Sequence, residues 1–160
     1  MDPVAFTALV TACAPLVHPA TAQALVAVES GFNPYAIGVV GGALERQPRS
    51  ASEAIATAIT LQAGGRTFSV GLAQISVTNL KRLGLTLPEA FDACRNLGAM
   101  QAVLSECVDR AGIGESPQRG LRRALSCYYS GNFSTGFRHG YVGRVVTAAR
   151  SAGAGVRGPP

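Results

Sequence analysis

Tryptophan is absent from this chain of 160 residues, and only 10 residues are aromatic. Charged residues make up 14%, against about a quarter in an average globular chain. Because 48% of the residues are apolar, this low charge does not indicate a disordered chain. Long apolar runs are lacking too: the most apolar stretch, residues 5–17, is short and contains Pro15, so no transmembrane segment is expected. The length predicts one domain with an aliphatic, alanine-rich core.

Histidine is scarce as well, with only His18 and His139 in the chain. The four cysteines are Cys13, Cys94, Cys107 and Cys127. Zinc sites usually draw ligands from closely spaced pairs, and no such pair occurs, so neither a metal site nor a cofactor is expected. An even number of cysteines in a small chain then favours two disulfides and an oxidising compartment.

Helix geometry narrows the disulfide pairing. If residues 95–111 form one helix, Cys94 and Cys107 lie about 20 Å apart along its axis. A disulfide needs Cα atoms within about 7 Å, so these two cysteines should not bond each other. A following helix that returns antiparallel would bring Cys127 beside Cys94. The predicted disulfides are therefore Cys94–Cys127 and Cys13–Cys107.

Acidic residues are few: nine carboxylates stand against 14 basic side chains, for a net charge of +5. The imbalance is concentrated late in the chain, where eight arginines and a single acid, Glu115, follow from residue 110 onward. Such a bias suits an anionic partner, for example nucleic acid, phospholipid headgroups or an acidic cell-wall polymer. Charge alone does not distinguish among these partners.

Apolar residues recur at helical spacing nearly throughout. The predicted helices cover about residues 6–13, 19–30, 51–63, 97–111, 117–128 and 141–149, with a short helix before Gly84. Residues 35–49 lose this period and predict a short hairpin or a loop with extended segments. The expected fold is mostly α, a single helical domain over residues 1–150 with a small β or loop insertion. Residues 151–160 lack periodicity and are predicted to be disordered.

Glu29 ends an apolar helix face that carries Ala22, Leu25 and Val26. Partial burial and the negative end of the helix would both raise the pKa of its carboxyl group. A carboxylic acid that stays protonated near neutral pH is what general acid catalysis requires. The same pattern also fits a plain, solvated last turn of an amphipathic helix.

Tyr128 takes the matching place on its own helix, where its hydroxyl could bond to a buried carboxylate. The same position also fits an ordinary half-buried tyrosine, which is the commoner case. Five of the ten aromatic residues fall within residues 128–141, and beside a cleft they could stack on sugar rings or bases. Core packing is the more common explanation of such a cluster. Residues 71–75 are predicted to form a turn that begins with glycine and could point Gln74 toward a ligand. They lack the signature of a phosphate loop.

Three segments, in this order, resemble the motifs of the goose-lysozyme-like (SLT-type) lytic transglycosylases. Residues 28–34, VESGFNP, look like the catalytic motif, and residues 71–75, GLAQI, resemble a Gly-Leu-Met-Gln-Ile segment. Residues 126–131, SCYYSG, resemble an Ala-Ala-Tyr-Asn-Ala-Gly segment. Residues 33–40 and 126–133 look more narrowly like the transglycosylase component of VirB-type type IV secretion and conjugation systems. The resemblance covers about residues 9–148 and implies a lysozyme-like fold.

The resemblance also implies roles for individual residues. Glu29 matches the single catalytic acid/base of the family. The residues expected to bind substrate are Ser30, Ser69, Gln74, Tyr128 and Tyr129. The chain departs from the family pattern where Ala73 replaces methionine and Tyr129 replaces asparagine, which affects sugar contacts more than chemistry.

The shortage of acids agrees with a mechanism that needs one carboxylate. Most glycosidases use two, and no other acid shares a motif with Glu29, although Glu45 in the adjoining insertion could approach it. The resemblance implies cleavage of the MurNAc–GlcNAc β-1,4 bond of peptidoglycan with formation of 1,6-anhydroMurNAc. The alternatives are a hydrolytic muramidase, a non-catalytic peptidoglycan-binding assembly module and, more weakly, a nucleic-acid-binding protein.

The implied partners are peptidoglycan glycan strands and subunits of the secretion system, with no nucleic acid expected. The implied location is the periplasm, where disulfides form. Residues 1–3 lack the basic region of an export signal, and residues 5–17 make a poor hydrophobic region. We therefore expect that an export signal has been removed or that another route delivers the chain.

Overall fold

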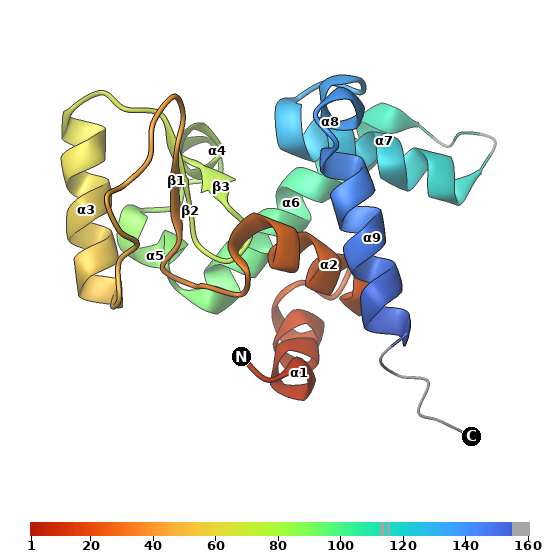
Figure 1. Cartoon of the computed structure of the whole chain (residues 1–160), viewed down its shortest axis with the longest axis horizontal. Coiled ribbons are helices and arrows are strands. Elements are labelled where there is room, and N and C mark those ends of the chain that lie inside the picture. The colour runs from red at the N-terminus through yellow and green to blue at the C-terminus, as the bar shows by residue number, and fades with distance from the viewer. Residues whose placement is uncertain (113, 115, 155–160) are drawn as a thin grey trace.

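The computed structural model describes residues 1–112, 114 and 116–154 (Figure 1). Its helices are α1 (Pro3–Cys13), α2 (Pro19–Ser30), α3 (Ala51–Ala63), α4 (Val77–Arg82), α5 (Leu87–Ala90), α6 (Ala93–Ala111), α7 (Pro117–Ser130), α8 (Thr135–Arg138) and α9 (Tyr141–Ala154). Its strands are β1 (Ile37–Val39), β2 (Phe68–Val70) and β3 (Ile75–Ser76). This architecture confirms a mostly α fold with a small β insertion.

Local signals set the boundaries of the helix that carries Glu29. α2 begins after His18, whose Nδ1 accepts a hydrogen bond from the Ala20 N–H at 3.2 Å. The helix ends at Gly31, which adopts the left-handed conformation with φ of +58°. Glycine enters this region at little cost, which explains why the helix stops there. Both boundaries confirm the sequence prediction and place Glu29 in the last turn.

The helix α3 also begins near the predicted residue, but its capping differs in detail. The Ser50 side chain accepts the Glu53 N–H, as expected from a capping box. The Glu53 carboxylate accepts the backbone N–H of Arg49 rather than that of Ser50. The spacing of Ser50 and Glu53 therefore predicted the start of α3 correctly. The Glu53 carboxylate, however, bonds to the residue before the N-cap.

The three strands form one antiparallel sheet in the order β1-β2-β3. Residues 35–49 make no hairpin of their own, because β1 pairs with β2 across the intervening α3, with Ile37 opposite Val70. The Gln47 side chain bonds both the N–H and the C=O of Ile37, at 2.8 and 2.9 Å, and so occupies the outer edge of β1 as a strand would. Of the two alternatives for residues 35–49, the loop with an extended segment is correct.

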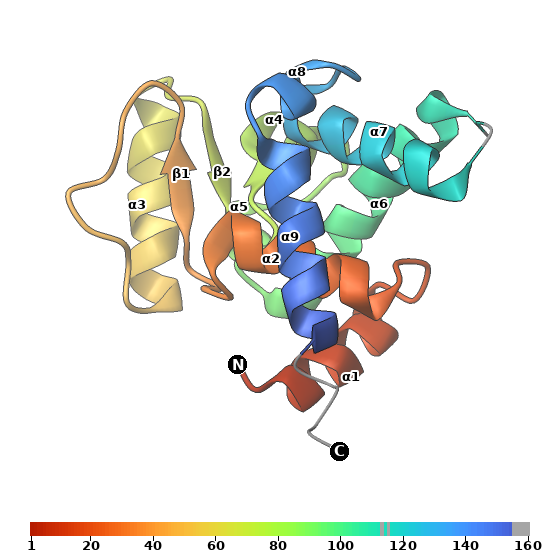
Figure 2. The same cartoon turned by 45° about the vertical axis from the view of Figure 1, so that its right-hand side comes forward.

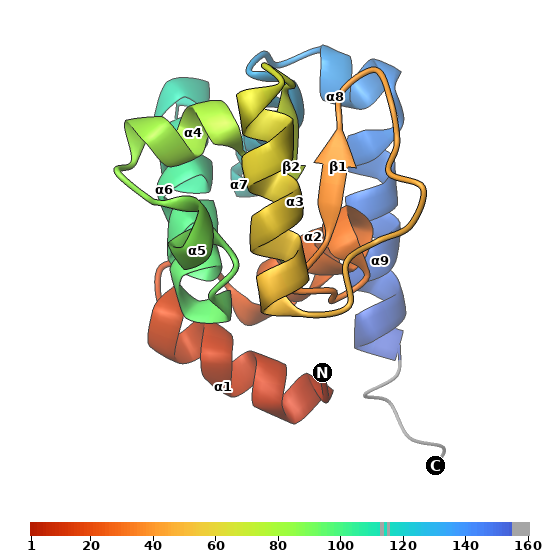
Figure 3. The same cartoon turned by 90° about the vertical axis from the view of Figure 1, so that its left-hand side faces the viewer.

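The helices α2 and α6 lie between two groups of elements. The sheet, α3 and α5 stand on one side, and α7, α8 and α9 stand on the other (Figure 1). α9 crosses α2 in both views of this region (Figure 1, Figure 2), and α3 lies along β1 and β2 (Figure 3). The buried core between these layers is aliphatic and alanine-rich, and its largest fully buried aliphatic side chains include Leu25, Leu72, Leu97 and Met100.

All four cysteines form disulfides, but the predicted pairing is wrong. Cys13 bonds Cys94, with 5.2 Å between their Cα atoms, and Cys107 bonds Cys127, with 5.7 Å. The exclusion of a Cys94–Cys107 bond is correct, since both residues lie on the single helix α6. The predicted bonds Cys94–Cys127 and Cys13–Cys107 assumed that α7 runs back along α6 to its beginning.

α7 instead crosses α6 near the C-terminal end of that helix. Arg123, in the middle of α7, still donates a hydrogen bond of 3.0 Å to the C=O of Ala111, the last residue of α6. This crossing brings Cys127 to Cys107, one turn before the end of α6. The end of α1 meets the beginning of α6 in turn, which places Cys13 beside Cys94.

The remaining differences concern short elements and the C-terminal boundary. Hydrophobic periodicity did not predict α5 and α8, because a helix of four residues is too short to show it. α9 continues through residues 151–154, so the helix runs one turn beyond residue 150, where the domain was expected to end. The rest of the predicted disordered tail, residues 155–160, lies outside the described residues. Among the described helices, none is both long and apolar enough to cross a membrane.

Candidate functional site

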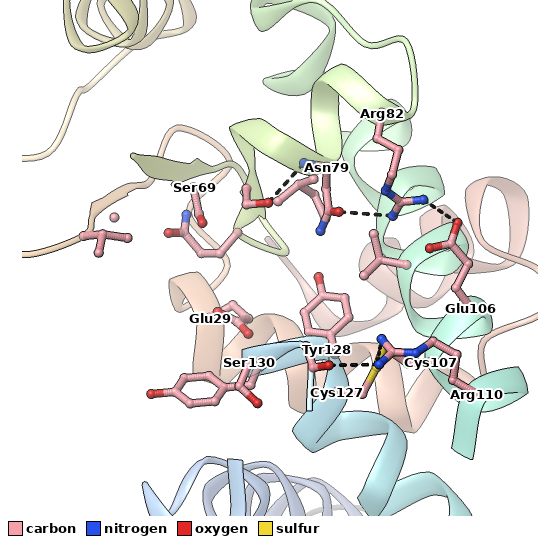
Figure 4. Close-up of a pocket in the computed structure, with 18 of the residues that line it drawn as sticks. Glu29, Ser69, Asn79, Arg82, Glu106, Cys107, Arg110, Cys127, Tyr128 and Ser130 are labelled. Carbon is pink, nitrogen blue, oxygen red and sulfur yellow. Dashed lines mark hydrogen bonds and ion pairs between the residues drawn. A yellow bond between two sulfur atoms is a disulfide. The ribbon is translucent and has the colours of Figure 1, made fainter. Parts of the chain in front are cut away.

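A cleft of about 460 Å³ lies where the sheet faces α6 and α7 (Figure 4). Its lining comes from α2, all three strands, α4, α6 and α7. Glu29 lies left of the centre of the view, and the ion pair between Arg82 and Glu106 lies at the right. The cleft therefore joins elements that are far apart in the sequence.

Glu29 is half-buried, and its carboxylate has a defined partner. The Tyr141 hydroxyl donates a hydrogen bond of 2.6 Å to Glu29 Oε1. Burial raises the pKa of Glu29 from 4.5 to about 7, against the opposing effects of the Tyr141 hydrogen bond and the positive charge of Arg144. The carboxyl group is therefore protonated in a large share of molecules at neutral pH, as general acid catalysis requires.

Tyr141 is the partner that sequence analysis missed. Of the two interpretations of Tyr128, the bond to a buried carboxylate does not form, because its hydroxyl donates to the C=O of Ala73, at 2.6 Å. Tyr141 reaches Glu29 because it begins α9, which packs across α2. The signal in the sequence was a tyrosine at the start of an apolar helix, since a buried tyrosine hydroxyl needs a partner.

Tyr128 connects α7 to the turn of residues 71–74. Burial, together with the nearby charge of Glu29, raises the pKa of Tyr128 well above its usual value, so the hydroxyl remains a donor. Its hydrogen bond to Ala73 fixes the distance between α7 and that turn. Tyr128 lines the cleft, as predicted, while its hydroxyl supports the cleft wall.

Gln74 also lines the cleft, and its amide has a structural task. Gln74 Nε2 donates to the C=O of Ala36 and of Gly71, each at 3.0 Å, and its backbone has a φ of +50°. Gly38 makes room for this side chain, since a Cβ at that position would lie 2.7 Å from Gln74 Oε1. The amide nitrogen thus ties the turn of residues 71–74 to the segment before β1.

Asn96 of α6 is a second residue that sequence analysis missed. Its side chain is 1% exposed and accepts a hydrogen bond from the Ala73 N–H at 2.8 Å. It also donates to the C=O of Val70 and of Ala90, at 3.0 and 2.8 Å. A Cβ on Gly71 would collide with this side chain, so only glycine fits there. The signal was an asparagine among the apolar positions of α6.

The other predicted substrate-binding residues divide into two groups. Ser69 of β2 and Tyr129 of α7 line the cleft. Ser30 does not belong to the lining, and its hydroxyl donates to the C=O of Val26 at 3.3 Å. The structure therefore gives the prediction for Ser30 no support, because the residue turns back onto its own helix.

Carboxylates are scarce around Glu29. Among the described residues that line the cleft, Glu106 is the one other carboxylate, and Arg82 binds it at 2.7 Å. That hydrogen bond and charge hold the pKa of Glu106 below its usual value. Glu45, which sequence analysis considered as a second acid, is exposed and lies outside the lining. Within the part of the chain that the structure describes, no cluster of three or more His, Cys, Asp or Glu side chains could hold a metal ion.

Comparisons with known proteins agree with the three motifs. Type IV secretion system protein virB1 of Brucella abortus (strain 9-941) is 51% identical over 154 residues, which are 91% of this chain and 64% of that protein. Protein virB1 of Agrobacterium fabrum is 36% identical over 142 residues, 86% of this chain and 56% of that protein. This chain thus spans less than two thirds of the length of these relatives. No solved structure matches it.

The model of the family described as the transglycosylase SLT domain matches residues 7–148. The matched region includes every element from α2 to α8 and all of the cleft lining. It also includes Glu29 and Tyr141, which are joined by the hydrogen bond of 2.6 Å. The chain therefore belongs to the transglycosylase SLT domain family.

Proposed function

We propose that this chain is a peptidoglycan lytic transglycosylase and that Glu29 is its single catalytic acid/base. The observation that carries the proposal is a carboxyl group with a pKa of about 7 in a cleft. The nearest rival, Glu106, is bound to Arg82 at the right of the cleft in Figure 4. A reaction that needs one carboxylate fits this arrangement better than one that needs two.

The reaction divides into two proton transfers through the same residue. Protonated Glu29 gives its proton to the glycosidic oxygen between MurNAc and GlcNAc, and the C1–O bond breaks. The N-acetyl group of the substrate stabilises the positive charge that develops at C1. The Glu29 carboxylate then removes the proton of the 6-hydroxyl group, and O6 bonds to C1 to give 1,6-anhydroMurNAc. Glu29 ends the cycle protonated, and no water is consumed.

The surrounding residues orient the acid and the substrate. Tyr141 donates to Glu29 and stabilises the carboxylate that exists between the two proton transfers. Ser69, Gln74, Tyr128 and Tyr129 line the cleft, and we assign them to binding the glycan strand. An exposed tyrosine such as Tyr129 offers a flat apolar face and a polar hydroxyl to a sugar ring.

The names of the relatives support a proposal for the biological setting. Type IV secretion system protein virB1 shares 51% identity with this chain. We propose that the chain opens the cell wall locally in the periplasm for a type IV secretion or conjugation apparatus, whose subunits would be its protein partners. Two disulfides agree with an oxidising compartment.

The test is digestion of purified peptidoglycan by the wild-type chain and by Glu29→Gln. Wild type should release anhydro-sugar fragments, which are lighter than hydrolysed fragments by one water. Glu29→Gln should lower their release by at least about a thousandfold, since the proton donor is lost. Glu45→Gln, at an exposed position outside the cleft, is the matched control and should keep wild-type activity.

Three outcomes would contradict the proposal. Undiminished release by Glu29→Gln would remove Glu29 from the chemistry. Products that carry the added water would identify a hydrolytic muramidase instead. Binding of peptidoglycan without any cleavage by the wild-type chain would identify a non-catalytic module.

A further inference from the structure

Tyr129 stands at a position where this chain departs from the pattern of its family, and it covers the partner of Glu29. Its ring stacks on the ring of Tyr141, with centroids 4.6 Å apart and an interplanar angle of 18°. Tyr129 is 40% exposed and lines the cleft, whereas Tyr141 is 2% exposed. Tyr129 therefore lies between the buried Tyr141 and the cleft.

His139 holds Tyr129 in this place. The Tyr129 hydroxyl and His139 Nδ1 form a hydrogen bond of 3.0 Å. The two rings also meet edge to face, with centroids 5.8 Å apart and an angle of 80°. His139 is thus in contact with the one cleft aromatic that stacks on Tyr141.

The backbone of His139 is itself anchored on two sides. Its N–H donates to the C=O of Thr135 at 2.9 Å, which closes α8. Its C=O accepts a hydrogen bond of 3.0 Å from the Arg144 guanidinium on α9. The imidazole therefore projects from a fixed point between α8 and α9, the helix that also carries Tyr141.

We propose that His139 is a positioning residue that keeps Tyr129 stacked on Tyr141 and thereby keeps water away from the Tyr141–Glu29 hydrogen bond. The importance of this contact for activity rests on the proposed role of Glu29 as the acid. The contact itself, and its effect on Glu29, do not depend on that role.

The effect on Glu29 has a definite direction. The titratable and charged groups that face Glu29 are Tyr141 and Arg144 from α9 and Tyr128 from α7. Tyr141 and Arg144 lower the pKa of Glu29, and burial raises it. Loosening Tyr129 admits water and weakens the one influence that raises the pKa, so the pKa of Glu29 should fall. The protonated acid is then lost at lower pH, and the alkaline limb of the pH–rate profile moves down in pH.

The experiment is a titration of side-chain carboxyl groups by ¹³C NMR on the full chain, with Glu29 assigned by the signal missing from Glu29→Gln. His139→Leu and Tyr129→Phe each remove one partner of the Tyr129–His139 hydrogen bond. In both variants the pKa of Glu29 should fall by about half a unit, which changes its protonated-to-ionised ratio about threefold. His139→Asn keeps a hydrogen-bonding atom near the position of Nδ1 and should restore most of the shift. Arg138→Lys changes the neighbouring exposed side chain without changing its charge and should leave the titration at its wild-type position.

The double variant of His139→Leu with Tyr129→Phe should show the same shift as either single variant, because both remove the same contact. An unchanged pKa of Glu29 in His139→Leu would overturn the proposal. A pKa of Glu29 that stays lowered in His139→Asn would overturn it as well. If His139→Leu does not fold, Tyr129→Phe decides alone by the same criterion. This titration needs no substrate, so it stands even if the wild-type chain releases no anhydro sugar, an outcome that would refute only the proposed function.

Discussion

At the scale of single residues, burial raises the pKa of Glu29 by more than two favourable contacts lower it. Tyr141 donates a short hydrogen bond to the carboxylate, and Arg144 attracts it, yet the pKa rises to about 7. Removing a carboxylate from water disfavours its charged form by more than these two groups restore. A group that pairs so closely with a tyrosine thus remains able to deliver a proton at neutral pH.

The raised pKa predicts how Glu29 affects stability as the pH changes. The folded protein holds the proton more tightly than the unfolded chain, where the pKa is 4.5. The contribution of Glu29 to stability is therefore complete below pH 4.5 and declines as the pH rises through about 7. The full shift would correspond to about 3 kcal/mol, and partial solvation of this half-buried group reduces it to about 2 kcal/mol.

Glu29→Gln should consequently stabilise the protein at pH 8 by about 2 kcal/mol and have little effect at pH 4. Thermal unfolding at the two pH values measures this difference, with a gain of several degrees expected at pH 8 only. Glu45→Gln, at an exposed position, should show no such pH-dependent gain. Equal effects of Glu29→Gln at both pH values would mean that the carboxyl group is not buried as described.

At the scale of elements, the turn of residues 71–74 is held by side chains from two other helices and by one side chain of its own. Tyr128 of α7 and Asn96 of α6 both bond to the backbone of Ala73. Gln74 ties the same turn to the C=O of Ala36. The periodicity of each helix predicted where α6 and α7 lie, but not that they meet at this turn, because such contacts depend on how the helices cross.

Asn96→Ala should test the support that α6 gives to this turn. The substitution removes the hydrogen bonds of Asn96 to the Ala73 N–H and to the carbonyl groups of Val70 and Ala90, at a cost of about 3 kcal/mol in the free energy of unfolding. Since the turn carries Gln74 into the cleft, cleavage of peptidoglycan should fall as well. Chemical denaturation and the product assay measure the two effects. Gln62→Ala, at an exposed position on α3, is the control, and an equal loss there would contradict the argument.

At the scale of the whole molecule, the two disulfides join different parts of the fold. Cys13–Cys94 closes a segment of 81 residues and ties α1 to the beginning of α6. Cys107–Cys127 closes 20 residues, and both of its cysteines line the cleft next to Tyr128. The loop-closure entropy predicts a larger stabilisation from the longer loop, about 4.5 against about 3.3 kcal/mol.

Removing one disulfide should therefore mainly affect stability, and removing the other should mainly affect activity. The Cys13→Ala, Cys94→Ala double variant should lose more free energy of unfolding, whereas the Cys107→Ala, Cys127→Ala variant should lose more activity because the cleft wall loosens. Denaturation curves and the release of anhydro sugars under non-reducing conditions measure both. If the variant that lacks Cys107 and Cys127 keeps full activity, this disulfide does not shape the cleft.

The sequence by itself determined the longer helices, the candidate acid and the family resemblance. The position of a helix depends on the spacing of its apolar residues and on the capping residues at its ends, as in α2 with His18 and Gly31. Both lie within one segment and can be read from the sequence. The motif around Glu29 is likewise contiguous. Only the tertiary structure decided the disulfide partners, the pairing of β1 with β2, and that Tyr141 rather than Tyr128 bonds to Glu29. These depend on the angles at which helices cross and on which buried hydroxyl reaches which acceptor, and such distances arise only when segments far apart in sequence pack together.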